Sequence, residues 1–209
     1  MTTGTIEATI GAMSWLDALE PAAPDPVAAF RNIDAGNFLS VRREVRRRAG
    51  QGSATSVVPQ LAALAEAVAE IVARLPDDAF SAAGGESDWN VAQAIGHDAS
   101  ARAGLVMAAS LAASGRWPAD APTVVPGIPG PGEASRADLF RKIAQSQRII
   151  ARVAAAIDGH ELDPCPLEHP LVGRLRCGEW LLFAGVHDLM HLEQLHGLEV
   201  TLASGSATR

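Results

Sequence analysis

Two proline-rich segments, residues 115–132 and 164–170, limit what this chain can fold into. Proline lacks the amide N–H that helix interiors and central strands require, so both segments predict irregular connections. Around them the pattern predicts helices over about residues 57–75, 90–114, 135–157 and 178–202, with no strand-like alternation of useful length. Four helices joined in this way indicate an all-α fold, and more specifically a four-helix bundle.

Local signals support the boundaries of these helices. Asn90 with Gln93, and Ser135 with Asp138, resemble capping boxes, which predicts that the second and third helices begin there. Aromatic residues make up only 4% of the chain and tyrosine is absent, which favours closely packed helices over a sheet. The first helix carries one continuous apolar stripe, formed by Leu61, Leu64, Ala65, Val68, Ile71, Val72 and Leu75.

The composition also argues against several classes of function. The net charge of -7 is unfavourable for a broad nucleic-acid surface. No apolar run approaches the length needed to span a bilayer, and none resembles a signal sequence. Cys165 and Cys177 lack the CxxC spacing and form no disulfide framework. We therefore expect a soluble, cytoplasmic protein that binds neither nucleic acid nor a membrane.

Residues 1–52 differ from the rest and predict a partly irregular N-terminal extension, whereas residues 53–209 form the expected bundle. Apolar residues recur every four positions near residues 38–49, which favours a short helix there. That helix carries the basic run 42–48, which has two interpretations. It is a charged helix that docks on the bundle, which the shortness of the run favours, or it is a contact for an acidic partner or nucleic acid.

Three histidines carry the main chemical signal. His187 and His191 lie four residues apart in the segment Gly185-Val-His-Asp-Leu-Met-His-Leu-Glu-Gln194. A helix turns about 100° per residue, so their side chains point about 40° apart and share one face. His97 lies in the second expected helix and could meet the pair from there. Three neutral imidazoles around a divalent ion make a site with a position open to a ligand.

The surroundings of these histidines favour a site in the bundle interior. Trp180 and Gln194 lie within about 20° of His187 and share its stripe. Buried polar side chains need partners, and a metal would satisfy both imidazoles of the stripe. The helix face around His97 carries small or amide side chains that leave room for a pocket, namely Asn90, Gln93, Ala94, Ala101, Gly104 and Ala108.

Four other polar residues near the histidines each have two interpretations. Asp98 and Asp188 lie about 100° off the site face, so surface charges are expected, with orientation of a neighbouring imidazole as the alternative. His160 and His169 lie in or beside the second proline-rich segment, where a surface role is favoured over that of a fourth ligand. An isolated HxxxH pair also arises by chance, so structural histidines are the competing interpretation.

Two segments of the chain resemble the signatures of the DinB-like (YfiT-like) superfamily. They are Trp89-Asn-Val-Ala-Gln-Ala-Ile-Gly-His97 and Glu179-Trp-Leu-Leu-Phe-Ala-Gly-Val-His187-Asp-Leu-Met-His191-Leu-Glu-Gln194. The resemblance extends over about residues 57–202 and implies an up-up-down-down four-helix bundle with a divalent metal, often zinc or nickel. It implies His97, His187 and His191 as the metal ligands. The N-terminal extension has no counterpart in it.

The resemblance also implies an activity, because the family includes bacillithiol and mycothiol S-transferases and a mycothiol-dependent maleylpyruvate isomerase. We therefore expect a metal-dependent S-transferase or isomerase that uses a small-molecule thiol on a small electrophilic substrate. Sixteen of the 17 basic residues are arginine, which indicates GC-rich codon usage and favours mycothiol as the thiol co-substrate. Gln194 and Gln93 are the candidate catalytic residues, as hydrogen-bond partners of the thiol or of a metal-bound water. Arg174 and Arg176 are the candidates to anchor a carboxylate.

Two other functions stay open. The same histidines could activate water in a metal-dependent hydrolase, although no carboxylate base is evident on the site face. The chain could also be a non-enzymatic helical bundle whose metal is structural or absent. In each case a homodimer is expected, since helix bundles with an open apolar side often dimerise.

Overall fold

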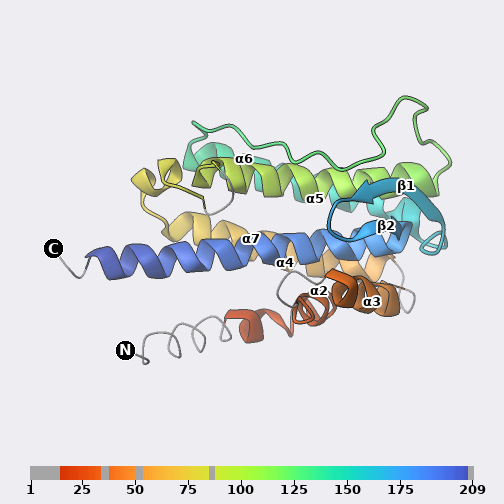
Figure 1. Cartoon of the computed structure of the whole chain (residues 1–209), viewed down its shortest axis with the longest axis horizontal. Coiled ribbons are helices and arrows are strands. Elements are labelled where there is room, and N and C mark those ends of the chain that lie inside the picture. The colour runs from red at the N-terminus through yellow and green to blue at the C-terminus, as the bar shows by residue number, and fades with distance from the viewer. Residues whose placement is uncertain (1–14, 34–37, 50–53, 85–87, 207–209) are drawn as a thin grey trace.

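Four long helices lie side by side in the computed structural model, which describes residues 15–33, 38–49, 54–84 and 88–206. Each of the first and second helices packs against both the third and the fourth. The predicted all-α four-helix bundle is therefore confirmed. Its helices are α4 (Ala54–Arg74), α5 (Val91–Ala113), α6 (Arg136–Val153) and α7 (Cys177–Ser206), with short 3-10 helices at η1 (Asp77–Ser81) and η2 (Ala154–Ile157) (Figure 1).

Capping side chains fix where α5 and α6 begin. Asn90 Oδ1 accepts a hydrogen bond from the backbone N–H of Gln93 at 2.8 Å. In return, Gln93 Oε1 accepts one from the backbone N–H of Asn90 at 2.9 Å. Ser135 and Asp138 make the same reciprocal pair at the start of α6. Both predicted capping boxes are confirmed, and each satisfies two backbone donors that the first helical turn leaves free.

The four helices run up, down, down and up along the chain. The crossover, residues 115–132, returns along the bundle, so α5 and α6 are parallel (Figure 1). Accordingly, Asn90 Nδ2 at the start of α5 donates to the carbonyl oxygen of Gly132, just before α6, at 2.9 Å. Arg74 at the end of α4 pairs with Glu199 near the end of α7, so these two are parallel as well. We had expected an up-up-down-down order, in which α4 and α5 would be parallel. In the structure these two helices are antiparallel.

The second proline-rich segment forms an antiparallel hairpin of β1 (Pro164–His169) and β2 (Gly173–Arg176). We had expected an irregular loop because of its prolines. The strand pairing is interrupted between Pro164 and Glu168, so Pro166 needs no N–H for the ladder. Gly173 has a φ of 68°, a backbone conformation that favours glycine at the turn. The hairpin buries Cys165, which is a free thiol, as is Cys177.

The crossover packs closely on α5. A β carbon built on Gly130 would lie 2.6 Å from Gly96 Cα, so only glycine fits there. The N–H of Gly130 donates to the carbonyl oxygen of Gln93 at 2.9 Å. Further back in the crossover, the N–H of Val125 donates to the carbonyl oxygen of Glu168 in β1 at 2.9 Å. The crossover is thus held on α5 at Gly130 and joined to β1 at Val125.

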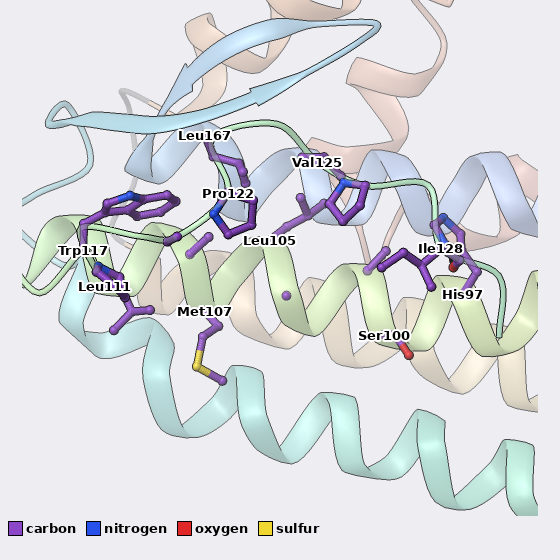
Figure 2. Close-up of a pocket in the computed structure, with 16 residues that line it drawn as sticks. His97, Ser100, Leu105, Met107, Leu111, Trp117, Pro122, Val125, Ile128 and Leu167 are labelled. Atoms are coloured by element: carbon purple, nitrogen blue, oxygen red, sulfur yellow. Dashed lines mark hydrogen bonds between the residues drawn. The ribbon is translucent and has the colours of Figure 1, made fainter. Parts of the chain in front are cut away.

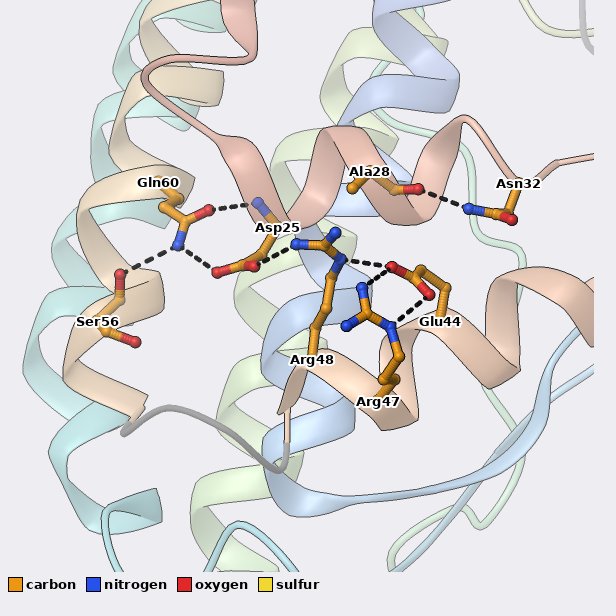
Figure 3. Close-up of polar contacts among 8 residues, drawn as sticks. All are labelled: Asp25, Ala28, Asn32, Glu44, Arg47, Arg48, Ser56 and Gln60. Atoms are coloured by element: carbon orange, nitrogen blue, oxygen red, sulfur yellow. Dashed lines mark hydrogen bonds and ion pairs between the residues drawn. The ribbon is translucent and has the colours of Figure 1, made fainter.

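The N-terminal helices α2 (Pro24–Phe30) and α3 (Phe38–Ala49) pack on α7. The amide of Gln60 in α4 accepts from the N–H of Asp25 at 2.9 Å and donates to its carboxylate at 2.8 Å (Figure 3). Arg48 joins the two N-terminal helices, because it bonds Asp25 Oδ1 at 2.8 Å and Glu44 Oε1 at 2.7 Å. These bonds attach α2 and α3 to each other and to the bundle.

The basic run of α3, predicted as a helix over residues 38–49, makes its contacts within the chain. Arg47 pairs with Glu44 of the same helix, and Arg46 lies 3.5 Å from the buried carboxylate of Glu179. Arg42 donates to the carbonyl oxygen of Arg174 at 3.1 Å. These contacts support the interpretation of a charged helix docked on the bundle.

Among the described helices, α4 is long and apolar enough to span a membrane by length and composition. This corrects our expectation that no segment reaches that length. Its apolar stripe is buried against the other helices, while Glu66 and Glu70 are exposed on the opposite side. A core helix of a soluble bundle has this distribution.

Candidate metal centre

The three histidines converge between α5 and α7. The ring centre of His97 lies 5.3 Å from that of His187 and 5.4 Å from that of His191. The rings of His187 and His191, one turn apart on α7, are 4.6 Å apart. One ring nitrogen from each histidine lies within 4.8 Å of the other two, a spacing that suits a shared metal ion.

Each of these histidines has an oxygen acceptor near Nδ1. His97 Nδ1 lies 2.8 Å from the carbonyl oxygen of Ile128, and His191 Nδ1 lies 2.9 Å from Gln194 Oε1. His187 Nδ1 lies 3.3 Å from Asp98 Oδ1. An Nδ1–H donor fixes the tautomer and leaves Nε2 of each ring free for a metal. The donor set therefore fits a divalent ion such as zinc or nickel, which takes neutral imidazole nitrogen.

Asp98 is buried beside His187 and is not a surface charge as we had expected. It is 1% exposed. Neither Asp98 Oδ1 nor His187 Nδ1 has a regular hydrogen bond to any described atom, and the two atoms lie 3.3 Å apart. Burial lowers the pKa of His187, although Asp98 opposes this, which keeps the imidazole neutral and able to bind a metal.

Asp188, also expected at the surface, is buried in an ion pair. Arg102 Nε lies 2.9 Å from one of its carboxylate oxygens and 3.1 Å from the other. Asp98, His187 and Asp188 form a second group of close donor atoms. Because Arg102 already occupies the Asp188 carboxylate, that group suits an ion pair better than a metal.

Arg102 connects all four helices of the bundle. From α5, its Nη1 donates to Ser146 Oγ and Gln147 Oε1 of α6, at 3.0 and 3.2 Å. Its Nη2 donates to the carbonyl oxygen of Leu61 in α4 at 2.6 Å. Together with the bonds from Nε to Asp188 of α7, these bonds use every side-chain nitrogen of Arg102, which is 1% exposed. The cation thus fixes the helices that carry the histidines.

A pocket of about 210 Å³ opens beside the three histidines. Gln194 and the apolar side chains of Trp89, Val125, Leu171 and Met190 contribute to its walls. This space next to the ring nitrogens is what a metal with an open ligand position requires. No carboxylate lines the pocket among the residues that the structure describes.

His169 of β1 also lines this pocket, which brings a fourth histidine close to the other three. Its Nδ1 accepts a hydrogen bond from the backbone N–H of Leu171 at 3.2 Å. Burial, with the nearby His187 and His97, lowers the pKa of His169 to about 4, so it is neutral at neutral pH. A neutral imidazole that accepts at Nδ1 carries its proton on Nε2. His169 is therefore a hydrogen-bond donor to the pocket and not a ready fourth ligand.

The structure places three of the other predicted site residues outside the pocket. Gln93 uses its amide in the cap of α5, where it bonds the N–H of Asn90. Arg174 is exposed and pairs with Glu168, and Arg176 is exposed at the start of α7. Of the four, only Gln194 lines the pocket, next to His191.

Comparison with known families agrees with this arrangement. A family model of the DinB superfamily matches residues 60–195, more than half of the chain and all three histidines. The chain belongs to the DinB superfamily. No curated protein and no solved structure matches the chain significantly. The DinB match begins within α4 and leaves α2 and α3 outside, so the helices docked on α7 are an addition to the DinB region.

The role of Asp98 in this DinB protein can be tested by an Asp98→Asn substitution. An amide is a weaker acceptor for His187 Nδ1–H, so we expect the affinity for zinc or nickel to fall about 10- to 100-fold. Calorimetric titration of the purified variant with each metal measures this change. The matched control is Glu193→Gln on α7, an exposed residue outside the pocket, which should keep wild-type affinity. Equal affinities in the two variants would contradict the role of Asp98.

Proposed function

We propose that this DinB protein is a cytoplasmic, metal-dependent transferase that attaches a low-molecular-weight thiol, such as mycothiol, to a small electrophile. One observation carries the proposal. His97, His187 and His191 present their free ring nitrogens to a pocket of about 210 Å³, with every Nδ1 near an acceptor. A divalent metal bound there would act as a Lewis acid that favours the thiolate, the nucleophilic form of a thiol.

The side chains around the histidines support the other requirements of such a reaction. Trp89, Leu171 and Met190 give the pocket apolar walls, which limit the access of water to a reactive sulfur. Among the described residues, only the amide oxygen of Gln194 has a hydrogen-bond partner, His191, which leaves the amide nitrogen to donate to a ligand. The Nε2–H of His169 is a further donor in the same space. Both groups suit the recognition of a thiol or of developing negative charge on the electrophile.

Hydrolysis has less support. A hydrolase of this kind needs a base that takes a proton from water, and among the described residues no carboxylate lines the pocket. Asp98, the nearest buried carboxylate, faces His187. Arg174 and Arg176 have no part in the proposal, because they lie outside the pocket.

The proposal is tested by conjugation of 1-chloro-2,4-dinitrobenzene by metal-loaded protein, with mycothiol, bacillithiol, glutathione and coenzyme A as separate thiols. In this reaction a carbon–sulfur bond forms, chloride leaves and the thiol proton passes to solvent. We expect absorbance of the thioether to grow faster than without protein for at least one thiol. A His191→Ala variant should lose that excess rate. Absence of turnover with every thiol, while metal analysis shows a loaded protein, would contradict transfer.

A further inference from the structure

An apolar groove of about 340 Å³ runs along α5 from the metal centre. His97 and Ile128 lie at one end, and Trp117 and Leu111 at the other (Figure 2). On the α5 side, the lining residues follow helical spacing: His97, Ser100, Ala101, Gly104, Leu105, Met107, Ala108 and Leu111. From residue 97 to 111 a helix rises by about 21 Å, so the groove is long and narrow.

The crossover covers the groove and is held in place by contacts with β1 and α5. The crossover residues Pro122, Val125 and Ile128 line it from above, together with Leu167 of β1 (Figure 2). The bond between Val125 N–H and the carbonyl oxygen of Glu168 joins the crossover to β1 at this level. The Gly130–Gly96 contact holds the other end. The crossover that covers the groove is therefore fixed at two points along its length.

The chemistry of the groove suits an uncharged apolar ligand. No charged residue lines it among those that the structure describes. The hydroxyl of Ser100 is already used, since it donates to the carbonyl oxygen of Gly96 at 2.8 Å. A charged ligand would lose its hydration there without compensation. Apolar cavities of about half this volume bind benzene-sized molecules.

The groove adjoins the pocket of the metal centre. Both are lined by His97, Ala101, Leu105 and Val125. A ligand with its apolar part in the groove would thus have its other end close to His97, which lines both spaces.

We propose that this groove binds the apolar part of the substrate, an uncharged aliphatic or alkyl-aryl group whose electrophilic end reaches His97. The assignment as substrate rests on the proposed transferase function, whereas the binding site itself does not. A three-membered epoxide at the end of an alkyl chain is one such electrophile. The thiolate would attack its terminal carbon, a carbon–sulfur bond would form as the carbon–oxygen bond breaks, and the alkoxide would take a proton from solvent.

Binding is measured first, by calorimetric titration of metal-loaded, full-length protein with hexan-1-ol, octan-1-ol and decan-1-ol. These probes need neither a thiol nor turnover, so failure of the transferase proposal leaves this result unaffected. We expect affinity to rise up to about fourfold for each added methylene, as expected for burial of a methylene group. An affinity that does not depend on chain length would overturn the proposal.

Two variants locate the bound chain. Ala108→Phe fills the distal half of the groove and should weaken decanol binding at least tenfold, with hexanol affected less and metal content unchanged. The matched control, Ala151→Phe, adds the same ring at an exposed position of α6 and should bind like the wild type. Gly104→Leu is the second filling variant, because a β carbon there meets nothing within 4 Å. Replacing glycine within a helix should also favour folding.

Two other outcomes would overturn the proposal, and a kinetic measurement tests it once turnover is established. Equal decanol affinity in the wild type and both filling variants would place the alcohol elsewhere and overturn the proposal. A dimer that dissociates in Ala108→Phe, without alcohol binding to the wild type, would assign the groove to a second copy of the chain and also overturn it. With turnover established, kcat/KM for 1,2-epoxyalkanes should rise with chain length in the wild type and lose that dependence in Ala108→Phe.

Discussion

The His187→Ala variant is expected to lose stoichiometric zinc or nickel. Two imidazoles would remain, and the Asp98 carboxylate, 3.3 Å from His187 Nδ1 in the wild type, would have no ligand to orient. We expect metal affinity to fall by more than about 100-fold, beyond the loss expected when only an orienting partner is removed. Elemental analysis after gel filtration measures the content, and calorimetric titration measures the affinity.

A second histidine of α7 gives the control for this experiment. His196→Ala removes an imidazole that pairs with Glu199, away from the metal centre. Its metal content should equal that of the wild type. The same metal content in His187→Ala and wild type would exclude the three-histidine centre, whatever reaction the protein carries out.

Replacing Arg102 by methionine is expected to destabilise the fold by about 3–5 kcal/mol, because the Asp188 carboxylate would be left buried without its cation. Arg102 and Asp188 are 1% and 0% exposed, so water cannot replace the lost partner. Urea unfolding followed by circular dichroism measures the free energy of unfolding. A loss below about 1 kcal/mol would show that the pair is not a structural element of the bundle.

Two further variants separate burial from charge. Arg74→Met removes the exposed ion pair with Glu199 and should cost less than about 1 kcal/mol. A double variant, Arg102→Met with Asp188→Leu, removes both buried charges. It should recover part of the stability lost in Arg102→Met, because the Asp188 carboxylate is no longer present to be buried without its cation.

The sequence was sufficient to predict that the three histidines lie close together, because their signal is local. The spacing of His187 and His191 fixes their relative direction on any helix. The capping box at Asn90 and Gln93 fixes the start of the helix that carries His97. Once both helices exist, only their approach in space is needed to bring the rings together, and a four-helix bundle provides it.

The surroundings of the histidines were harder to predict because α5 and α7 are buried on more than one side. Residues 100° away from the site face on such helices still point into protein, as Asp98 and Asp188 do. The assumption of one buried face holds for α4, where Glu66 and Glu70 are exposed, but not for these two helices. Arg102 gave no sequence signal, because its partners come from three other helices.

Long-range placement explains the other differences. Arg174 and Arg176 are close to α7 in sequence, but the hairpin between α6 and α7 directs them to the surface. The same hairpin places His169 in the pocket, where the proline-rich sequence had favoured a surface role. Strand pairing interrupted at a proline leaves little alternation to recognise in the sequence.

The four-helix contacts of Arg102 also have a consequence for how the protein unfolds. Its guanidinium is satisfied only when α4, α6 and α7 are all in place around α5. A partly assembled bundle, with one helix detached, would hold a cation lacking some of its partners inside an apolar core. Such intermediates are therefore less stable than both the native and the fully unfolded chain. We therefore expect the bundle to unfold cooperatively, with the same midpoint for secondary structure and for the environment of the buried Trp180.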